Sequence, residues 1–229
     1  MKSLPDNYGS QEYFYNNFYE SSRGLKSRGL ISILWRLPHS IMEARHSENK
    51  GKVIAELGIG FGEHISFVEG SWERYIGLDL ILRESQIKSQ SSRVEIVKTD
   101  AHETGLIDNL ADRIVATCLI AHLENPEKAL KEWNRICKAG GTITIFMPCE
   151  TSPLLSIFRQ LYIKPKSRKM GFDGYDLFIR REHRNSYWLI NGLIRQLFDK
   201  SQIIEKRRPF PLLSWRWNAF SVYEIEVMK

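Results

Sequence analysis

The sequence feature that most constrains the fold is the segment Val53–Gly62, VIAELGIGFG. Its first half is apolar and β-branched, as expected of a buried strand, and three glycines follow at alternate positions. Glycine lacks a Cβ and readily adopts positive φ, so such a turn lets the backbone approach a ligand closely. Asp79 ends a second strand-like run, 23 positions after Glu56. A glycine turn followed at this distance by an acid is typical of α/β folds that bind a nucleoside through its ribose.

The spacing of these glycines separates two kinds of nucleotide ligand. Proteins that bind a dinucleotide favour G-x-G-x-x-G, which places a pyrophosphate at a helix N-terminus. Here the order is Gly58-x-Gly60-x-Gly62, with Glu56 before it. A carboxylate beside the turn is unfavourable for a diphosphate and favourable for a cation. The pattern therefore disfavours an NAD-binding oxidoreductase, although a tight strand–helix turn without any ligand stays an alternative.

Strand and helix signals alternate from residue 52 to about residue 148. A nearly continuous apolar run at 113–120 is expected to be a central parallel strand. Asn125 and Pro126 begin a helix, with Asn as the cap and Pro at the first position, and Gly140–Gly141 is expected to end it. This alternation predicts a doubly wound, mostly parallel α/β sheet. The other strands are expected at 52–57, 74–80, 94–100 and 142–147, with a helix starting over 62–70.

Two regions lie outside the alternating pattern. Residues 1–50 carry a group of aromatic side chains and then an amphipathic stretch, which we interpret as an N-terminal helical cap on the core. Residues 51–229 are expected to form the main domain, with an insertion for substrate recognition at about 150–186. The tail is expected to supply a helix at 187–199 and two strands, at 202–206 and 219–227.

Ordered motifs across roughly residues 50–150 resemble those of class I S-adenosylmethionine-dependent methyltransferases. Besides the glycine turn and Asp79, they include the acid after the third strand, the fourth strand with its following loop, and the helix–turn segment 133–142. Ala139 departs from the family pattern, which commonly has proline there. The whole pattern, with Glu182-His183-Arg184-Asn185, resembles the type-11 group. It implies a seven-stranded Rossmann-like sheet whose last two strands are antiparallel.

The resemblance implies that the cofactor is S-adenosyl-L-methionine and assigns it a set of residues. Asp79 is expected to accept hydrogen bonds from both ribose hydroxyls, and Asp100 one from the adenine amino group. A helix cap is the alternative role for Asp79, and a turn residue the alternative for Asp100. Glu56 is expected to place negative charge near the cationic ligand. The full expected set is Glu56, Gly58, Gly60, Gly62, Asp79, Leu80, Asp100, Ala101 and Cys118.

Three residues are catalytic candidates. His122 follows the fourth strand, where parallel sheets bind their ligands, and histidine is the usual base near neutral pH. Glu182 and His183 are adjacent, so we expect them to act together, the acid orienting the imidazole. An oxygen acceptor needs such a base, whereas a neutral amine needs it much less. The alternatives are a structural role for His122 and a solvated charged surface for the other two.

The formal net charge is +6, and basic residues gather in the insertion, at 164, 166, 168, 169, 180, 181 and 184. An anionic or glycosylated small-molecule acceptor is therefore expected, with peripheral contact to a membrane surface as an alternative. Aromatics at 172, 175 and 178 are expected to stack on a sugar or ring. No oligomeric state is indicated. Nucleic acid is not an expected partner, because no Asn-Pro-Pro-Tyr-like motif or separate RNA-binding module is present.

Three cysteines, at 118, 137 and 149, are widely spaced and show no metal-ligand or redox spacing. No metal site is therefore expected. The start of the chain lacks the apolar run of a signal peptide, so a cytoplasmic location is expected. The leading functional hypothesis is O-methylation of a sugar or of a glycolipid or polysaccharide precursor. N-methylation of a phospholipid headgroup or other amine is the second, an RNA methyltransferase is a weaker third, and a non-catalytic S-adenosylmethionine-binding protein is the fourth.

Overall fold

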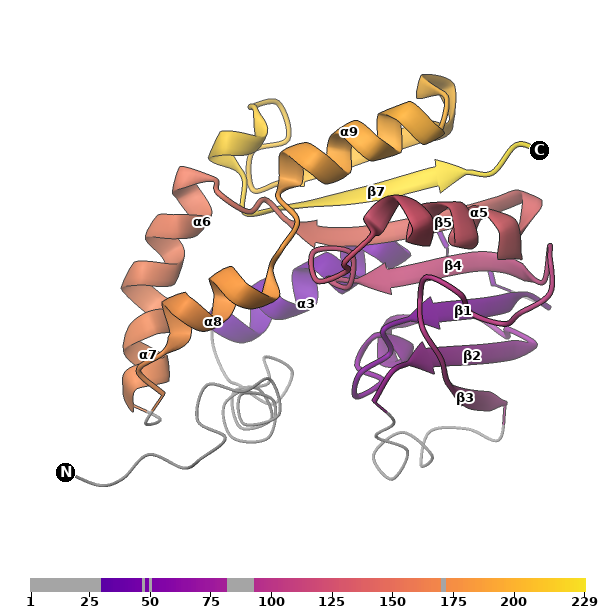
Figure 1. The fold of residues 1–229 in the computed structure, drawn as a ribbon, viewed down its shortest axis with the longest axis horizontal. Coiled ribbons are helices and arrows are strands. Elements are labelled where there is room, and N and C mark those ends of the chain that lie inside the picture. The colour runs from indigo at the N-terminus through magenta and orange to yellow at the C-terminus, as the bar shows by residue number, and fades with distance from the viewer. Residues whose placement is uncertain (1–29, 47, 50, 82–92, 170–171) are drawn as a thin grey trace.

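The computed structural model describes residues 30–46, 48–49, 51–81, 93–169 and 172–229. Seven strands form one sheet in the order β3-β2-β1-β4-β5-β7-β6 (Figure 1). The first five are mutually parallel, and β7 runs antiparallel to both β5 and β6. The expected fold class and the antiparallel pair at the edge are therefore confirmed. The strands are β1 Val53–Leu57, β2 Arg74–Asp79, β3 Val94–Lys98, β4 Ala111–Thr117, β5 Cys137–Pro148, β6 Ile203–Arg208 and β7 Phe220–Glu226.

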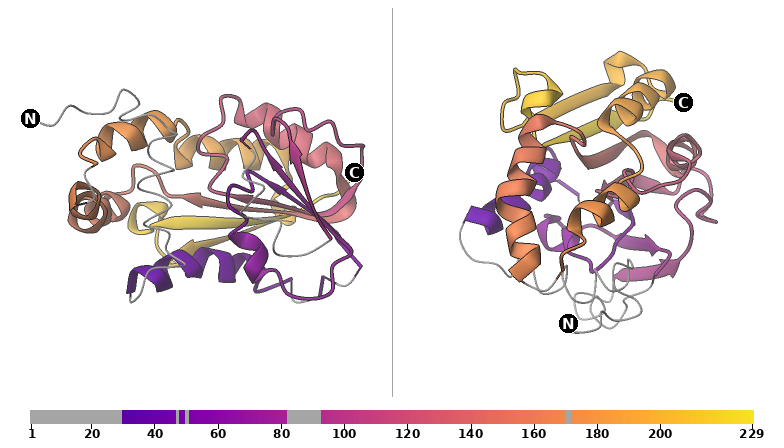
Figure 2. Two further views of the ribbon diagram at one scale, coloured as in Figure 1. Left: turned by 90° about the horizontal axis from the view of Figure 1, so that it is seen from below. Right: turned by 60° about the vertical axis from the view of Figure 1, so that its left-hand side comes forward.

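Helices cover both faces of the sheet. The helices α5 (Pro126–Ile136) and α9 (Tyr187–Leu197) pack on one face, and α3 (Leu30–Glu43) packs on the other with the short 3-10 helix η2 (His64–Phe67) (Figure 2). The α5 helix begins as expected, because the Asn125 side chain accepts a hydrogen bond from Lys128 N at 2.9 Å. Two further 3-10 helices, η4 (Lys200–Gln202) and η5 (Trp215–Trp217), flank β6.

The insertion between β5 and α9 is helical. It contains α6 (Pro153–Phe158), the π-helical η3 (Arg159–Ile163), α7 (Lys164–Lys169) and α8 (Tyr175–Glu182). Figure 1 shows these helices beyond the carboxyl ends of the parallel strands. The insertion therefore lies at the edge of the sheet where ligands of open α/β folds bind.

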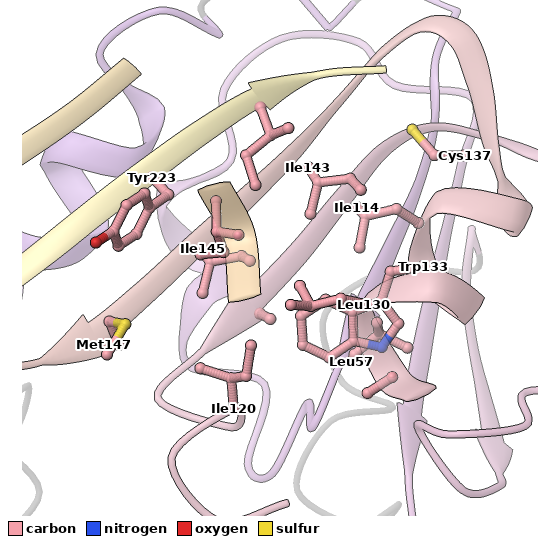
Figure 3. Packing of buried hydrophobic residues seen from close by; sticks show 14 of the residues in the cluster. Leu57, Ile114, Ile120, Leu130, Trp133, Cys137, Ile143, Ile145, Met147 and Tyr223 are labelled. Carbon is pink, nitrogen blue, oxygen red and sulfur yellow. The ribbon is translucent and has the colours of Figure 1, made fainter. Parts of the chain in front are cut away.

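The larger hydrophobic core lies between the sheet and the α5–α9 layer. Figure 3 shows Leu130 and Trp133 of α5 close to Leu57 of β1, and all three side chains are fully buried. Trp133 Nε1 also donates a 3.0 Å hydrogen bond to Ala101 O, which ties α5 to the loop after β3. Removing a buried Trp side chain typically costs about 3–5 kcal/mol, so this residue is central to the stability of that layer.

A buried polar network fixes α3 on the opposite face. Arg113 on β4 donates to both carboxylate oxygens of Glu43, at 2.7 and 2.9 Å, and to Met42 O at 3.2 Å. His64 Nε2 lies 2.9 Å from the same carboxylate, and His39 Nδ1 lies 2.9 Å from His64 Nδ1. His64 is buried and joins η2 to α3.

Two expected boundaries were also wrong. The helix expected over 62–70 is only the single turn η2, and the chain is extended again at Val68. The α5 helix ends at Ile136, and Gly140–Gly141 lies within β5 instead of ending the helix. Gly140 has φ +74°, and a Cβ at Gly141 would lie 2.9 Å from Asp112 O. These glycines therefore allow an irregularity in β5 where it meets β4 and β7.

Of the expected N-terminal cap, only α3 and the residues after it are described, and residues 1–29 lie outside the described residues. Within the described ranges, every helix is too short or too polar to cross a membrane.

Candidate functional site

The glycine turn folds over the end of β2. Gly58 and Gly60 have φ +71° and +55°, and Gly58 N donates to Leu78 O at 2.7 Å. A Cβ at Gly58 would lie 2.9 Å from the Leu119 side chain, so glycine is required there by space as well as by φ. Among the described residues, a Cβ at Gly60 would meet only one atom, at 4.0 Å, so they leave the backbone of this turn open on one side. Gly62 completes the turn with φ +72°.

Glu56 lies at the end of β1, buried below the turn. It accepts a 2.7 Å hydrogen bond from Tyr75 OH and a longer one, 3.4 Å, from Thr117 Oγ1. Burial raises the pKa of Glu56 to about 8, which outweighs the stabilisation that these two donors give the carboxylate. The expected negative charge at this position is therefore partly suppressed near neutral pH, and a nearby cation would restore it.

Asp79 is the last residue of β2, next to the turn. Its Oδ2 accepts from Gly60 N at 2.8 Å, and its Oδ1 accepts from Ile81 N at 3.0 Å. Each carboxylate oxygen can accept a further hydrogen bond. Leu80, the next residue, has 59% of its surface exposed and therefore presents an apolar side chain beside this carboxylate.

Asp100 lies two residues after β3 and is half exposed. Its Oδ1 accepts a 2.8 Å hydrogen bond from His102 N and pairs with His102 Nδ1 at 2.5 Å. The backbone hydrogen bond from His102 is the main cause that lowers the pKa of Asp100. Ala101 is held through its carbonyl oxygen by Trp133, as described above. The structure thus gives Asp100 a histidine partner that sequence reasoning missed.

The loop after β4 carries Cys118 and His122. Cys118 has φ +59°, a strained conformation for a residue other than glycine, and its N–H donates to Phe146 O at 2.9 Å. His122 N donates to Leu119 O at 2.9 Å. Because Leu119 is the residue that would meet a Cβ at Gly58, this loop lies directly against the glycine turn. The loop joins the candidate cofactor residues to the candidate catalytic ones.

His183 does not pair with its sequence neighbour Glu182. Its Nδ1 instead pairs with Glu150, which follows β5 and is buried. Arg159 donates to both oxygens of Glu150, at 2.5 and 2.6 Å. Burial opposes ionisation of Glu150, but the hydrogen bonds from Arg159 and His183 outweigh it and lower the pKa of Glu150 to about 2. The expectation that Glu182 orients His183 was therefore wrong, because the acid that pairs with His183 is Glu150.

Sequence reasoning missed Glu150 and Arg159. The available signal was the place of Glu150, two residues beyond the end of a strand that points to the same sheet edge as β4.

His122 and His183 meet edge to face, with ring centroids 4.6 Å apart. Burial lowers the pKa of His122 to about 3, and the neighbouring His183 adds to this effect. His122 is therefore a neutral imidazole near pH 7. Its Nδ1 lies 4.0 Å from Glu182 Oε2, beyond hydrogen-bond distance. The structure thus brings both histidines and Glu182 together, whereas the sequence placed only His122 at the sheet edge and did not predict this grouping.

Two expectations for the insertion change. The aromatic side chains expected to stack on a sugar are buried, with 2, 6 and 5% of their surface exposed at Phe172, Tyr175 and Phe178. Three of the seven basic residues pair with acids, because Lys164 pairs with Asp176, Arg168 with Asp173 and Arg184 with Glu124. Most of the remaining basic side chains are exposed.

A family model described as "Methyltransferase domain" matches residues 55–145, which span the glycine turn, Asp79, Asp100 and the loop after β4. A phosphatidylethanolamine N-methyltransferase from Cereibacter sphaeroides is 28% identical over 109 residues. That match covers 44% of this chain and 53% of the relative, so it spans about half the length of the curated protein.

Solved structures share the fold. A putative S-adenosylmethionine-dependent methyltransferase from Methanococcus maripaludis has a TM-score of 0.65 at 16% identity, with 100% of this chain and 98% of that chain covered. A possible histamine N-methyltransferase from Thermotoga maritima has a TM-score of 0.60 at 19% identity, covering 94% and 98%. Phosphoethanolamine N-methyltransferase 2 from Haemonchus contortus, solved with S-adenosyl-L-methionine, has a TM-score of 0.59 at 14% identity, covering 85% and 53%.

Proposed function

Because this chain is a class I S-adenosylmethionine-dependent methyltransferase, we propose that its acceptor is a small molecule that presents a hydroxyl group beside His122 and His183. The observation that carries this proposal is the buried pair of His183 and Glu150, which is held by Arg159. An imidazole fixed by an ionised carboxylate is the arrangement of a general base, and a hydroxyl needs one more than a neutral amine does.

The residues at the glycine turn fit the methyl donor. The open side of Gly60 leaves room for a ligand against the backbone. Asp79 keeps acceptor capacity on both oxygens for vicinal hydroxyls, in addition to its two backbone hydrogen bonds. Glu56 supplies a carboxyl group whose ionised form a cationic ligand would stabilise. When bound, the donor supplies an electrophilic methyl group on a sulfonium.

The chain's own contribution is alignment and proton transfer. The contact of Leu119 with the glycine turn holds the loop of His122 close to the donor's place, so an acceptor between them is positioned for in-line displacement. The Nδ1 atom of His183 is bound to Glu150, which leaves Nε2 as the atom that takes the acceptor's proton. Glu150 stays ionised and stabilises the imidazolium that forms.

An amine of a phospholipid headgroup is the second candidate acceptor. The similarity to a phosphatidylethanolamine N-methyltransferase favours it. Exposed apolar side chains on the insertion, at Ile157, Leu161 and Leu177, and exposed Arg180 and Arg181 also favour it, because apolar and basic side chains together suit an anionic lipid surface. A sugar acceptor has less support, since the aromatic side chains expected to stack on it are buried.

The test is an acceptor screen with labelled S-adenosylmethionine. The purified full chain is incubated with a panel of hydroxyl compounds and, in parallel, with phosphatidylethanolamine vesicles, and the labelled products are identified by mass spectrometry. We expect label on oxygen, and we expect His183→Gln to slow that transfer about 10²-fold or more. Label found only on the lipid amine, with His183→Gln as fast as the parent chain, would overturn the proposal in favour of the second candidate.

A further inference from the structure

We propose that Cys118, His122 and His183 form a three-ligand site for a divalent transition-metal ion, with Zn²⁺ as the expected occupant. One sulfur and two imidazole nitrogens, one atom from each residue, lie within 4.8 Å of one another. One thiolate and two imidazoles are a ligand set that Zn²⁺ accepts in proteins, and three protein ligands leave a fourth position open. The sequence did not indicate this site, because its third ligand comes from the insertion, 61 residues after His122.

The distances require only small movements. In a tetrahedral Zn²⁺ site the ligand atoms lie about 3.3–3.6 Å apart, given the usual metal–nitrogen and metal–sulfur lengths. The present limit of 4.8 Å therefore asks for an approach of at most about 1.2–1.5 Å, which rotation of the Cys118 and His122 side chains would supply. The two histidine rings already lie in edge-to-face contact, with their centroids 4.6 Å apart.

Glu150 provides the outer contact that metal-binding histidines usually have. A ligating imidazole commonly binds a carboxylate through its other nitrogen, which fixes the ring and raises its basicity. His183 has this contact, because its Nδ1 pairs with Glu150 and leaves Nε2 for the ion. Arg159 in turn holds Glu150 through two hydrogen bonds, at 2.5 and 2.6 Å, so the ring orientation is fixed before any ion binds.

His122 Nδ1 is the second, independent observation. This atom is buried, and it has no hydrogen-bond partner within the part of the chain that the structure describes. Buried nitrogen atoms are nearly always hydrogen-bonded, so an orphan of this kind calls for a physical explanation. A metal ion beside Cys118 and His183 would provide one.

Cys118 contributes the sulfur ligand and the proton that metal binding releases. A free cysteine thiol is ordinarily protonated near neutral pH, and the thiolate is the form that binds a metal. Binding forms one metal–sulfur bond, breaks the S–H bond and releases one proton to solvent, while the neutral imidazoles release none. The positive φ of Cys118, +59°, is a strained conformation of the kind found at ligand sites.

The ion and the catalytic proton would compete. The proposed function uses the lone pair of His183 Nε2 to take the acceptor's proton, and the ion would occupy the same lone pair. Metal binding and action of His183 as a base therefore exclude each other, and a bound ion reduces transfer that depends on that base. Only this consequence rests on the proposed function, because the binding itself depends on geometry alone.

The experiment uses Co²⁺ as a spectroscopic substitute for Zn²⁺ on the chelator-treated full chain. We expect one ion per chain, a thiolate-to-cobalt charge-transfer band and the release of one proton per ion. Cys118→Ser should lose the band and bind at least about tenfold more weakly, and Glu150→Gln should bind about 10–100-fold more weakly. Cys149→Ser is the matched control, because Cys149 is also a free cysteine but lies outside the cluster. It should keep the band.

The absence of a charge-transfer band in the parent chain, or an equal band in Cys118→Ser, would overturn the metal site. Thermal melting of each variant shows whether it is folded, so a lost band in a folded Cys118→Ser chain counts in favour. Methyl transfer by the chelator-treated chain is measured separately. Transfer that persists without a cobalt band leaves the proposed function standing and removes only the metal site. A cobalt band without O-methyl transfer supports the metal site and removes the proposed function.

Discussion

His183 Nδ1 is bound to Glu150, a residue 33 positions earlier in the chain, and not to the adjacent Glu182. The pairing joins the turn after β5 to the end of α8, so the insertion carries the imidazole to the carboxyl edge of the sheet. Neighbours at the end of a helix point in different directions, and that separation decides the partner. The acid that orients the His183 imidazole is consequently Glu150, which is buried.

Glu150→Gln should lower the turnover number about 10²-fold, because the neutral amide no longer stabilises the imidazolium of His183. The affinity for S-adenosylhomocysteine should stay within twofold, since Glu150 does not touch the glycine turn. Steady-state kinetics and calorimetry measure the two quantities. Glu182→Gln is the matched comparison and should reduce turnover much less. A larger loss in Glu182→Gln than in Glu150→Gln would restore the sequence-based pairing.

Asp79→Ala should weaken the binding of S-adenosylmethionine by roughly 1.5–3 kcal/mol, as for the loss of hydrogen bonds to a charged group. Part of the loss comes from the turn itself, because Asp79 also accepts from Gly60 N at 2.8 Å. Asp79→Asn keeps one acceptor oxygen and should fall between the parent and Ala. Asp173→Ala, an exposed acid in the insertion, serves as control for calorimetry. Equal affinities in all four proteins would remove Asp79 from the ribose site.

Glu56 should make the protein less stable as pH rises from about 4.5 to about 8. Its pKa is about 8 in the folded state and near 4.5 when exposed, so over this interval the unfolded state releases a proton that the folded state keeps. The loss is at most about 4 kcal/mol. Urea denaturation at pH 5 and pH 8 measures it. Glu56→Gln should abolish most of the difference, whereas Glu95→Gln, at an exposed position, should retain it.

The affinity for the methyl donor should change with pH in the opposite direction to stability, and Glu56 is again the cause. A bound sulfonium favours the ionised form of Glu56, so below pH 8 binding must release a proton, and affinity should rise as pH approaches 8. S-adenosylhomocysteine has a neutral sulfur and should show a weaker trend. Calorimetry on both ligands from pH 6 to pH 8.5 tests this. Parallel curves for the two ligands would show that Glu56 does not sense the sulfonium charge.

The sheet could be predicted because local signals specify it. Apolar or alternating runs mark the parallel strands, and the first three are followed by a glycine or end near an acid. The strand order then follows from the fold class that the glycine turn indicates. The helix over 62–70 and the end of α5 were predicted wrongly, because both depend on tertiary context. At Gly140–Gly141 the chain continues as a strand since β4 and β7 lie on either side of it.

The candidate site could be predicted only in part. The glycine turn, Asp79 and the loop of His122 each follow a strand, so topology alone brings them to one edge. Glu150, Arg159 and the grouping of Cys118 with both histidines depend on how the insertion packs, and sequence spacing does not encode that. The buried pair of Arg113 and Glu43 was also missed, because Arg113 lies in a strand where an apolar residue is expected.

That buried pair is the basis of the last prediction. Arg113→Met should lower the free energy of unfolding by about 3–5 kcal/mol, because it leaves Glu43 buried without its main partner. Glu43→Leu should be similarly destabilising, while the double variant should recover much of the loss, since neither charge is then left unpaired. Urea denaturation of the four proteins completes the double-mutant cycle, with exposed Arg74→Met as control. If the two single effects simply add, the pair does not fix α3 to β4.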